Sequence, residues 1–338
     1  MINSTVSTVH GNQDEVSLSA CSEALSSRKP VTGFEYSTMR TSISSVISLL
    51  MICGNLLILL VLHKVSSIQP PSRVLFRCLS ITDLCVGLVS LPLFVVYRMA
   101  VEENNWSLCS KSEGLAFVVS TVLCGQSITT LTAISVDRLL ALQLRLRYRQ
   151  VVTLPRVRLS VTISWVANFA FTFTYYWNKP VFFLGGCGYI FTFIIISSCC
   201  YFKIYLVLRY RQVEIQPLSQ GISSSQRREV LGSSPAQIQG SNPRVLSVLN
   251  INRYKKTVSN AIWVHSILVI CYLPYTVATA ITASRGEPLF GTRYKLLGSI
   301  TGTLLFFNSL LNPFLYCWRM KGIRQSVKQL FGSIFSWS

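Results

Sequence analysis

Seven long apolar runs constrain this chain more than any other feature of its sequence. Each run is close to the ~20 residues that cross a hydrocarbon core roughly 30 Å thick, and they lie at 42–62, 74–97, 114–136, 157–177, 181–202, 258–283 and 294–317. Half of the residues are hydrophobic and only 13% are charged, which is too apolar for a soluble protein of 338 residues. The runs therefore predict an all-α membrane protein built as a seven-transmembrane helix bundle.

Positive charges are distributed unevenly between the gaps that separate these runs. If the N-terminus is outside the cell, 22 of the 31 Lys and Arg residues fall in cytoplasmic segments, whereas eight of the 12 acidic residues fall in extracellular ones. An excess of Lys and Arg in cytoplasmic loops is typical of membrane proteins. It predicts a multi-pass plasma membrane protein with an extracellular N-terminus, and it explains the net charge of +19 without a nucleic-acid partner.

Composition divides the chain into three parts. Residues 1–40 are expected to form an extracellular tail, and residues 41–318 the transmembrane domain. Within that domain, residues 213–250 are rich in Ser, Gln, Gly and Pro and are expected to form a flexible third cytoplasmic loop. Residues 319–338 are expected to form an amphipathic helix on inner-leaflet lipids and a short cytoplasmic tail, because two kinds of side chain recur there at helical spacing: apolar Met320, Ile323, Val327 and Leu330, and basic Arg319, Lys321, Arg324 and Lys328.

Two asparagines and two cysteines fall on the extracellular side of this topology. Asn3 and Asn105 each begin an Asn-X-Ser/Thr triplet and are candidate glycosylation sites. Cys21 and Cys109 are the two cysteines that clearly lie outside the bilayer in an oxidising compartment. They are expected either to form a disulfide between the tail and the loop after the second span or to remain as two free thiols.

Asp83 is the one acidic residue deep within an apolar run. Charged groups are costly in hydrocarbon, so such a residue indicates function. Other runs carry hydroxyl and amide oxygens that could surround it, and hard oxygen ligands of this kind suit a small cation. We therefore expect an allosteric Na⁺ site, and no other cofactor, formed by Asp83 with Ser127, Asn308, Ser309 and Asn312, with Asn55 nearby.

Several short motifs occur in order within these runs. They are Gly54-Asn55 in the first, Leu79 and Asp83 in the second, Asp137-Arg138 at the end of the third, Trp165 in the fourth, Cys271-Tyr272-Leu273-Pro274 in the sixth and Asn308-Ser-Leu-Leu-Asn312-Pro313-Phe-Leu-Tyr316 in the seventh. In order and spacing, residues 40–331 resemble the rhodopsin-like (class A) G-protein-coupled receptors. The resemblance implies a receptor without catalytic chemistry, in which an extracellular ligand drives outward movement of the sixth helix and nucleotide exchange on a heterotrimeric G protein.

The resemblance also implies roles for particular residues. Pro274 removes a backbone donor, so the sixth span is expected to kink there. Tyr272, two residues earlier, stands where the family usually has Trp. Pro313 lies in the motif of the seventh span that runs from Asn308 to Tyr316. Tyr254 stands where many relatives have an acid that pairs with the arginine of the Asp-Arg motif, so raised basal signalling is expected. The residues implied for the activation switch and the G-protein contact are Asp137, Arg138, Leu146, Tyr201, Tyr254 and Tyr316.

Departures from the family pattern narrow the resemblance. The position of the usual extracellular cysteine, 25 residues before Arg138, holds Glu113, and the fifth span has Phe193 in place of its usual proline. In these respects the chain is similar to the melanocortin, adenosine and cannabinoid branch. The ligand is left open among small molecules, lipids and peptides, and the candidate ligand pocket comprises Glu113, Phe117, Ser120, Tyr272 and Tyr275.

Other functions of a multi-span protein fit the sequence less well. An opsin needs a lysine seven residues before Pro313, where this chain has Phe306. A simple monoamine ligand is disfavoured because the residue 18 positions before Arg138, an aspartate in amine receptors, is Ser120. A secondary transporter is the alternative to a receptor, but no inverted repeat is visible. An enzyme is not expected, since the one intramembrane histidine, His265, is more typical of packing than of a ligand.

Overall fold

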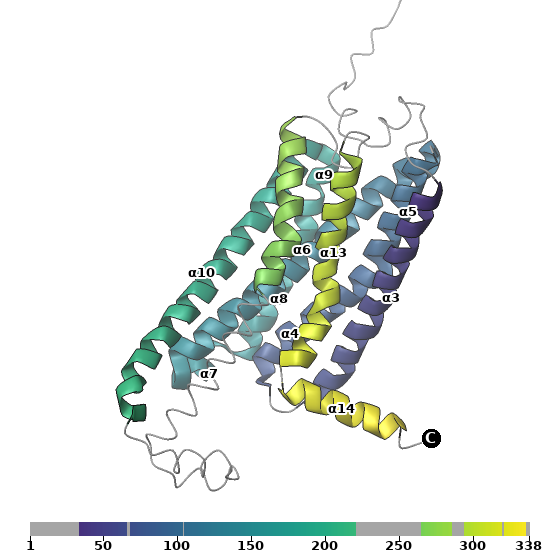
Figure 1. Ribbon diagram of the computed structural model, residues 1–338. Coiled ribbons are helices and arrows are strands. Elements are labelled where there is room, and N and C mark those ends of the chain that lie inside the picture. The colour runs from purple at the N-terminus through teal and green to yellow at the C-terminus, as the bar shows by residue number, and fades with distance from the viewer. Residues whose placement is uncertain are drawn as a thin grey trace, which may run out of the picture.

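The structure is a computed structural model. It describes residues 34–65, 68–103, 105–220, 265–285, 294–319 and 321–335. Over these ranges the chain is helical and contains no strand, which confirms the predicted all-α architecture. Figure 1 shows the long helices packed as a bundle with α14 crossing one end. In chain order the elements are α3 (Phe34–Lys64), α4 (Pro70–Cys85), η1 (Val86–Ser90), α5 (Leu91–Glu102), α6 (Trp106–Leu144), η2 (Arg145–Arg147), α7 (Tyr148–Val151), α8 (Leu154–Thr172), α9 (Thr174–Trp177), α10 (Lys179–Gln220), the helix His265–Ser284, α13 (Lys295–Arg319) and α14 (Lys321–Phe335).

Among the described residues, six helical segments are long and apolar enough to cross a bilayer, and they overlap every predicted span except the fourth. Residues 258–264 of the sixth predicted span lie outside the described residues. The fourth span, predicted at 157–177, comprises α8 and the short α9, and α8 carries Arg156 and Arg158 near its start. Its outer face is nevertheless apolar, since Leu159, Ile163 and Val166 are 58–64% exposed. Apolar side chains turned outward at helical spacing suit contact with lipid, so α8 completes the bundle.

The second predicted span is not one regular α-helix. Between α4 and α5 lies the π-helical turn η1, in which the Leu91 N–H donates to the Val86 carbonyl five residues earlier. Pro92, at the start of α5, has no N–H to donate, which favours a local change of register. Gly87 lets this wider turn approach α3, because a Cβ there would meet α3 atoms at 3.1–3.2 Å. Ser48 of α3 donates its hydroxyl to the Gly87 carbonyl at 2.6 Å and so holds the turn in place.

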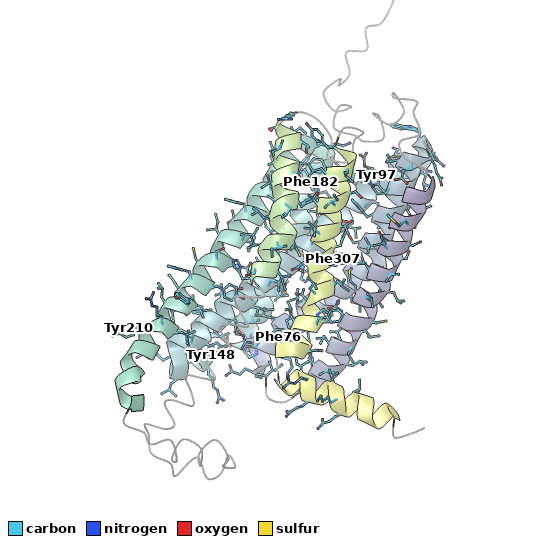
Figure 2. The ribbon with its side chains drawn as sticks, viewed as in Figure 1. Phe76, Tyr97, Tyr148, Phe182, Tyr210 and Phe307 are labelled. Carbon is cyan, nitrogen blue, oxygen red and sulfur yellow. The ribbon has the colours of Figure 1, made fainter. Side chains whose placement is uncertain are left out.

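The two ends of the bundle carry different aromatic side chains. Figure 2 shows Tyr97 and Phe182 toward one end and Phe76 and Tyr148 toward the other. At the first end, Asn178 alone separates α9 from α10, as expected from the short gap in the sequence. A one-residue connection is too short to form a lid.

α14 is the predicted amphipathic helix. Ile323 is fully buried, whereas Arg324 and Lys328 are exposed. Figure 1 shows the helix leaving α13 and running across the base of the bundle. Its apolar side therefore packs inward and its basic side faces outward.

α10 is longer than the predicted fifth span. It continues to Gln220, so the first eight residues of the expected loop 213–250 are helical. Extending an existing helix adds a hydrogen bond for each residue fixed, and Arg211, Gln212, Glu214 and Gln216 are good helix formers. The rest of that loop lies outside the described residues, as do Asn3, Cys21 and Tyr254.

Candidate functional site

A buried carboxylate cluster lies between α4, α6 and α13. Asp83 Oδ1 accepts hydrogen bonds from Ser127 Oγ at 3.0 Å and Ser309 Oγ at 2.7 Å. Its Oδ2 accepts a hydrogen bond from Asn312 Nδ2 at 2.7 Å. All four side chains are at most 2% exposed. The structure thus brings four of the five residues predicted for a cation site into direct contact.

Three buried polar groups near this cluster have no hydrogen-bond partner among the described residues: Asn308 Nδ2, Asn55 Oδ1 and the Tyr316 hydroxyl. Asn55 Nδ2 donates to the Ser309 carbonyl at 3.2 Å, which places Asn55 against the cluster. A buried polar group without a partner costs about 1–3 kcal/mol, so these groups indicate that water or an ion completes the site. A carboxylate with hydroxyl and amide oxygens is a set of ligands that fits Na⁺.

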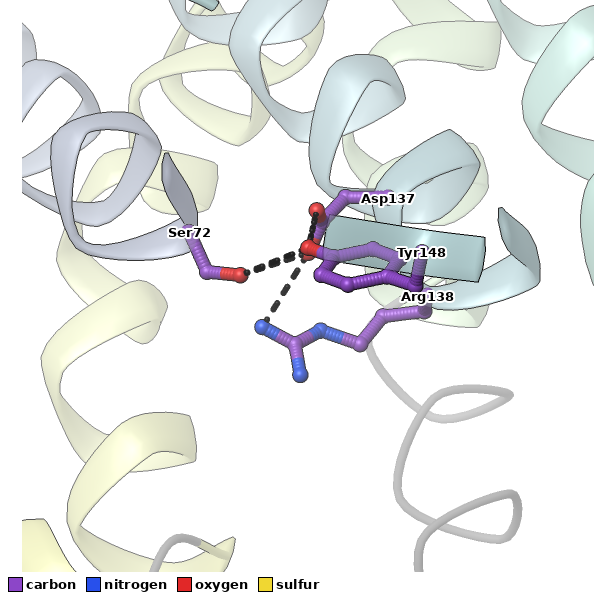
Figure 3. Close-up of polar contacts among 4 residues, drawn as sticks. All are labelled: Ser72, Asp137, Arg138 and Tyr148. Atoms are coloured by element: carbon purple, nitrogen blue, oxygen red, sulfur yellow. Dashed lines mark hydrogen bonds and ion pairs between the residues drawn. The ribbon is translucent and has the colours of Figure 1, made fainter. Parts of the chain in front are cut away.

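The Asp137-Arg138 pair lies near the end of α6 and is held by several elements (Figure 3). The Tyr148 hydroxyl donates to Asp137 Oδ1 at 2.5 Å, and Ser72 Oγ donates to Oδ2 at 2.9 Å. Arg138 lies 3.3 Å from the same Oδ2, and its guanidinium lies 5.7 Å from the centre of the Phe76 ring. The Asp137 side chain is 4% exposed and that of Arg138 is 35% exposed. Asp137 is therefore fixed by α4 and α7, whereas Arg138 keeps one side open.

Tyr201 and Tyr316, which the family resemblance pairs with Arg138 in an active state, make no hydrogen bond to it among the described residues. The Tyr201 hydroxyl accepts a hydrogen bond from Ser135 Oγ at 3.0 Å. The Tyr316 ring packs edge-on against Phe76 with centroids 5.1 Å apart. Phe76 thus contacts both Tyr316 and Arg138, and the structure shows the arginine paired with its own neighbour Asp137.

His265 makes a contact that the sequence did not predict. Its Nδ1 lies 3.1 Å from Ser197 Oγ and its Nε2 lies 2.9 Å from Ser198 Oγ. Ser198 Oγ donates to the Ile194 carbonyl, so it accepts from Nε2–H, which leaves Nδ1 to accept from Ser197. His265 therefore links the helix His265–Ser284 to α10. The adjacent serines are the one signal in the sequence, but which side chain faces them depends on how the two helices pack.

A cavity that opens to solvent lies between α5, α6, α8, α10, α13 and the helix His265–Ser284. Four of the five residues predicted for a ligand pocket line it: Phe117, Ser120, Tyr272 and Tyr275. Glu113 does not line it. That carboxylate is buried and lies 3.8 Å from Lys179 Nζ of α10, so the protein itself supplies a cation to the acid that was expected to meet a ligand.

Tyr272 connects this cavity to the carboxylate cluster. The side chain is 1% exposed and lines the cavity, and its hydroxyl donates to the Cys124 carbonyl at 3.3 Å. Cys124 precedes Ser127 by about one helical turn of α6, and Ser127 donates to Asp83. The Tyr272 hydroxyl, which stands where the family usually has an indole ring, thus binds the part of α6 that contains Ser127, a hydrogen-bond partner of Asp83.

The extracellular candidates are partly described. Asn105 is exposed, and its Oδ1 accepts the Leu108 N–H at 3.1 Å, which caps the start of α6. Cys109 is 2% exposed and disulfide-bonded, whereas the other nine cysteines of the described residues are free. Its expected partner, Cys21, lies outside the described residues.

Peptide mapping without reductant is expected to recover Cys109 linked to Cys21. Closing so long a loop restricts the unfolded chain by about 4 kcal/mol if the bridge is unstrained, so Cys21→Ser should lower the melting temperature. Cys199→Ser, at an exposed free cysteine of α10, is the matched control and should leave it unchanged. Recovery of Cys21 and Cys109 as separate alkylated peptides would contradict the assignment.

Comparison with known proteins identifies relatives of the whole bundle. The family model of the 7 transmembrane receptor (rhodopsin family) matches residues 54–180 and 172–316. The histamine H2 receptor of Homo sapiens is 25% identical over 314 residues, which cover 86% of this chain and 79% of that receptor. The adenosine receptor A2b of Mus musculus is 24% identical over 310 residues, 84% of this chain and 87% of the receptor. The trace amine-associated receptor 8b of Rattus norvegicus is 23% identical over 305 residues, 83% of this chain and 82% of the receptor.

These matches decide between the alternatives left by the sequence. They span the Asp83 cluster, the Asp137-Arg138 pair and the cavity, and the relatives are receptors, so the chain is a multi-pass membrane receptor rather than an enzyme or a transporter. Amine and adenosine receptors match about equally, so identity alone does not select a ligand. The chain belongs to the rhodopsin family of seven-transmembrane receptors.

Proposed function

We propose that this receptor couples occupancy of the cavity to nucleotide exchange on a heterotrimeric G protein. The observation that carries the proposal is the set of contacts made by the Arg138 side chain. Within the described residues it is paired with Asp137 of its own helix and rests on Phe76, and its side chain remains 35% exposed. An arginine that no acid of another helix holds there can change partners when a neighbouring helix moves.

Movement of the helix His265–Ser284 is the proposed activating step. Pro274 lies inside this helix, where it removes a backbone hydrogen bond and clashes with the preceding turn, so the helix can bend there. Tyr272 lines the cavity two residues earlier. A ligand that displaces Tyr272 would therefore swing the half of the helix that carries His265 and make room for the C-terminal helix of a Gα subunit beside Arg138, Tyr201 and Tyr316.

Leu146 supplies a second contact for the G protein in this proposal. It lies in η2, just beyond the end of α6, and is 95% exposed. An apolar side chain on a cytoplasmic turn gains stability when a partner covers it, at roughly 1.5–3 kcal/mol for a fully buried leucine. We assign Leu146 to an apolar pocket on Gα.

The Asp83 cluster is proposed to bind Na⁺ and to favour the resting arrangement. The carboxylate of Asp83, the hydroxyls of Ser127 and Ser309 and the amide oxygens of Asn55 and Asn308 would hold the ion. When bound, the ion supplies a positive charge that offsets the burial of the carboxylate. A ligand shifts an equilibrium between two states only by the difference in its affinities for them, so the effect of Na⁺ requires a cluster that changes on activation.

The N-terminus is proposed to be extracellular. The distribution of Lys and Arg favours this orientation. Cys109, which is disulfide-bonded, lies near the start of α6, and disulfides persist in oxidising compartments. The opposite end of α6 carries Arg138 and lies at the same end of the bundle as the basic helix α14, as a cytoplasmic surface requires.

A second-messenger panel tests the proposed function. The full-length chain would be expressed in cells and challenged with peptide, nucleoside, lipid and amine libraries, with readouts for each Gα class. We expect at least one readout to change, and to return to the level of untransfected cells in Arg138→Ala at matched surface expression. If no readout departs from untransfected cells, with or without library compounds, the proposed coupling is wrong.

Basal signalling is expected to fall about fivefold on Tyr254→Glu. The residue 20 positions before Pro274 is Tyr254, flanked by Arg253, Lys255 and Lys256, so the resting state lacks an acid for Arg138 at this position. Supplying one would favour the resting state by about 1 kcal/mol. Basal second-messenger levels at matched surface expression measure the change, and Tyr210→Glu, at an exposed tyrosine of α10, controls for added charge. Equal basal levels in the two variants would mean that the Asp83 cluster or packing around Pro274 holds the resting state.

A further inference from the structure

The described lining of the cavity is largely aromatic and carries no fixed charge. Rings from six helices surround it: Phe94, Phe117, Phe171, Phe183, Tyr275 and Phe306. Aspartate, glutamate, lysine, arginine and histidine are absent from its described lining. Concave sites with apolar and aromatic walls accept small organic ligands, and flat rings pack against such walls in stacked or edge-on geometry.

The two positions at which a charge was expected do not supply one to a ligand. Glu113 is 7% exposed and pairs with Lys179, whose Nζ lies 5.5 Å from the centre of the Tyr175 ring. Ser120, where amine receptors have an aspartate, lies in a hydrogen bond of 2.7 Å with Ser90. A cationic ligand would lose its hydration on entering the cavity without gaining a carboxylate, and an unpaired buried charge is strongly unfavourable.

Most polar groups of the lining are engaged within the protein. Asn168 donates to Gln126 Oε1 at 3.0 Å and accepts the Tyr189 hydroxyl at 2.9 Å. The Tyr272 hydroxyl is bound to the Cys124 carbonyl. These groups hold the helices together and are not available to a ligand without breaking those bonds.

Thr279 is the exception. It lines the cavity and is 4% exposed, and its Oγ1 interacts with the hydroxyl of Tyr275, which also lines the cavity, without reaching the geometry of a full hydrogen bond. A buried hydroxyl in this state is unfavourable unless another molecule satisfies it. It therefore marks one edge of the cavity at which a ligand can donate or accept a single hydrogen bond.

We propose that the cavity binds an uncharged, planar aromatic compound with one hydrogen-bonding edge directed at Thr279. The inference rests on the proposed function, since it names the class of ligand for the same cavity. It excludes monoamines on structural grounds, although amine receptors are among the relatives. Rings can also attract a cation through their faces, and the test below measures that outcome directly.

The test is binding to the purified full-length receptor in lipid nanodiscs, measured by thermal shift without any G protein. The probes are carboxamide derivatives of quinoline, isoquinoline and acridine, each compared with its permanently charged counterpart that is methylated on the ring nitrogen. A ligand that binds the folded state raises the melting temperature by mass action. We expect uncharged members to bind at least tenfold more tightly than their charged counterparts.

Three variants make the assignment specific. Thr279→Val keeps the shape of the side chain and should weaken hydrogen-bonding probes about tenfold, while probes that lack the hydrogen-bonding group should be unaffected. Thr192→Val, at an exposed threonine of α10, is the matched control and should change nothing. Ser120→Asp should reverse the preference toward the charged probes, because it supplies the missing carboxylate.

The outcomes separate the ligand class from the proposed function. Equal or tighter binding of the charged probes, no binding by any uncharged probe, or an equal response of the two threonine variants would overturn the ligand class. Binding of uncharged probes by a receptor that accelerates nucleotide exchange neither with nor without them would support the ligand class and overturn the proposed coupling. Nucleotide exchange driven by charged probes alone would support the proposed coupling and overturn the ligand class.

Discussion

Replacing Asp83 with asparagine is expected to abolish the effect of sodium on basal nucleotide exchange. In the wild type, exchange with a G protein should be 5–150-fold slower in sodium chloride than in the chloride of the large organic cation N-methyl-D-glucamine, for a coupling of about 1–3 kcal/mol. Asp83 is the one carboxylate of the described cluster, and it is bound by Ser127, Ser309 and Asn312. Without its charge, the hydroxyl and amide oxygens alone are weak ligands for Na⁺, so the variant should respond equally to both salts.

A buried residue of the same helix gives the control for this experiment. Ser80 is fully buried and its hydroxyl makes no hydrogen bond among the described residues. Ser80→Ala removes a polar group from α4 without touching the cluster, so it should keep the full sodium effect. A wild-type receptor whose exchange rate is the same in both salts would refute the sodium site, whatever the variants do.

Removing the Tyr148 hydroxyl is expected to raise basal activity by about tenfold or more. Burial, reinforced by the hydrogen bond to Asp137, raises the pKa of Tyr148 to about 12, so the hydroxyl is protonated at physiological pH and donates to the carboxylate. A hydrogen bond to a charged group contributes about 1.5–3 kcal/mol. If the bond belongs to the resting arrangement, Tyr148→Phe lowers the stability of that arrangement by this amount and increases the active fraction accordingly.

The matched control is Tyr210→Phe, which makes the same chemical change at a tyrosine that is 74% exposed. Basal exchange by the two variants should be compared at equal receptor concentration, together with surface expression in cells. If Tyr148→Phe behaves like Tyr210→Phe, then Ser72 and Arg138 alone are sufficient to hold Asp137, and α7 does not contribute to the resting state.

The sequence predicted which polar residues face the interior of the bundle. Asp83 and Asn312 are 229 positions apart in the sequence, yet Asn312 Nδ2 lies 2.7 Å from Asp83 Oδ2. This is expected for polar groups that cannot face lipid. The apolar runs likewise predicted the helices, and the short gap before Val181 predicted that only a few residues link α9 to α10. These features depend on the pattern within each run and on the family motifs, which a single sequence contains.

Contacts that depend on how helices rotate against each other were not predicted. The turn η1 inserts an extra residue into the second span, which rotates α5 by about 100° relative to an unbroken helix. Two further contacts join different helices: Glu113 contacts Lys179, and His265 contacts Ser197 and Ser198. They depend on the relative height and rotation of those helices, which no single apolar run specifies. For the same reason the sequence assigned Glu113 to a ligand pocket that it does not line.

The most direct test of the account is GDP–GTP exchange by purified Gα subunits with the full-length receptor in lipid nanodiscs. The account predicts that at least one Gα class exchanges nucleotide faster with the receptor than with empty nanodiscs, even without ligand. It also predicts that Arg138→Ala removes this acceleration while the receptor keeps its thermal stability. Exchange rates equal to those of empty nanodiscs for every Gα class, with and without bound ligand, would contradict the account.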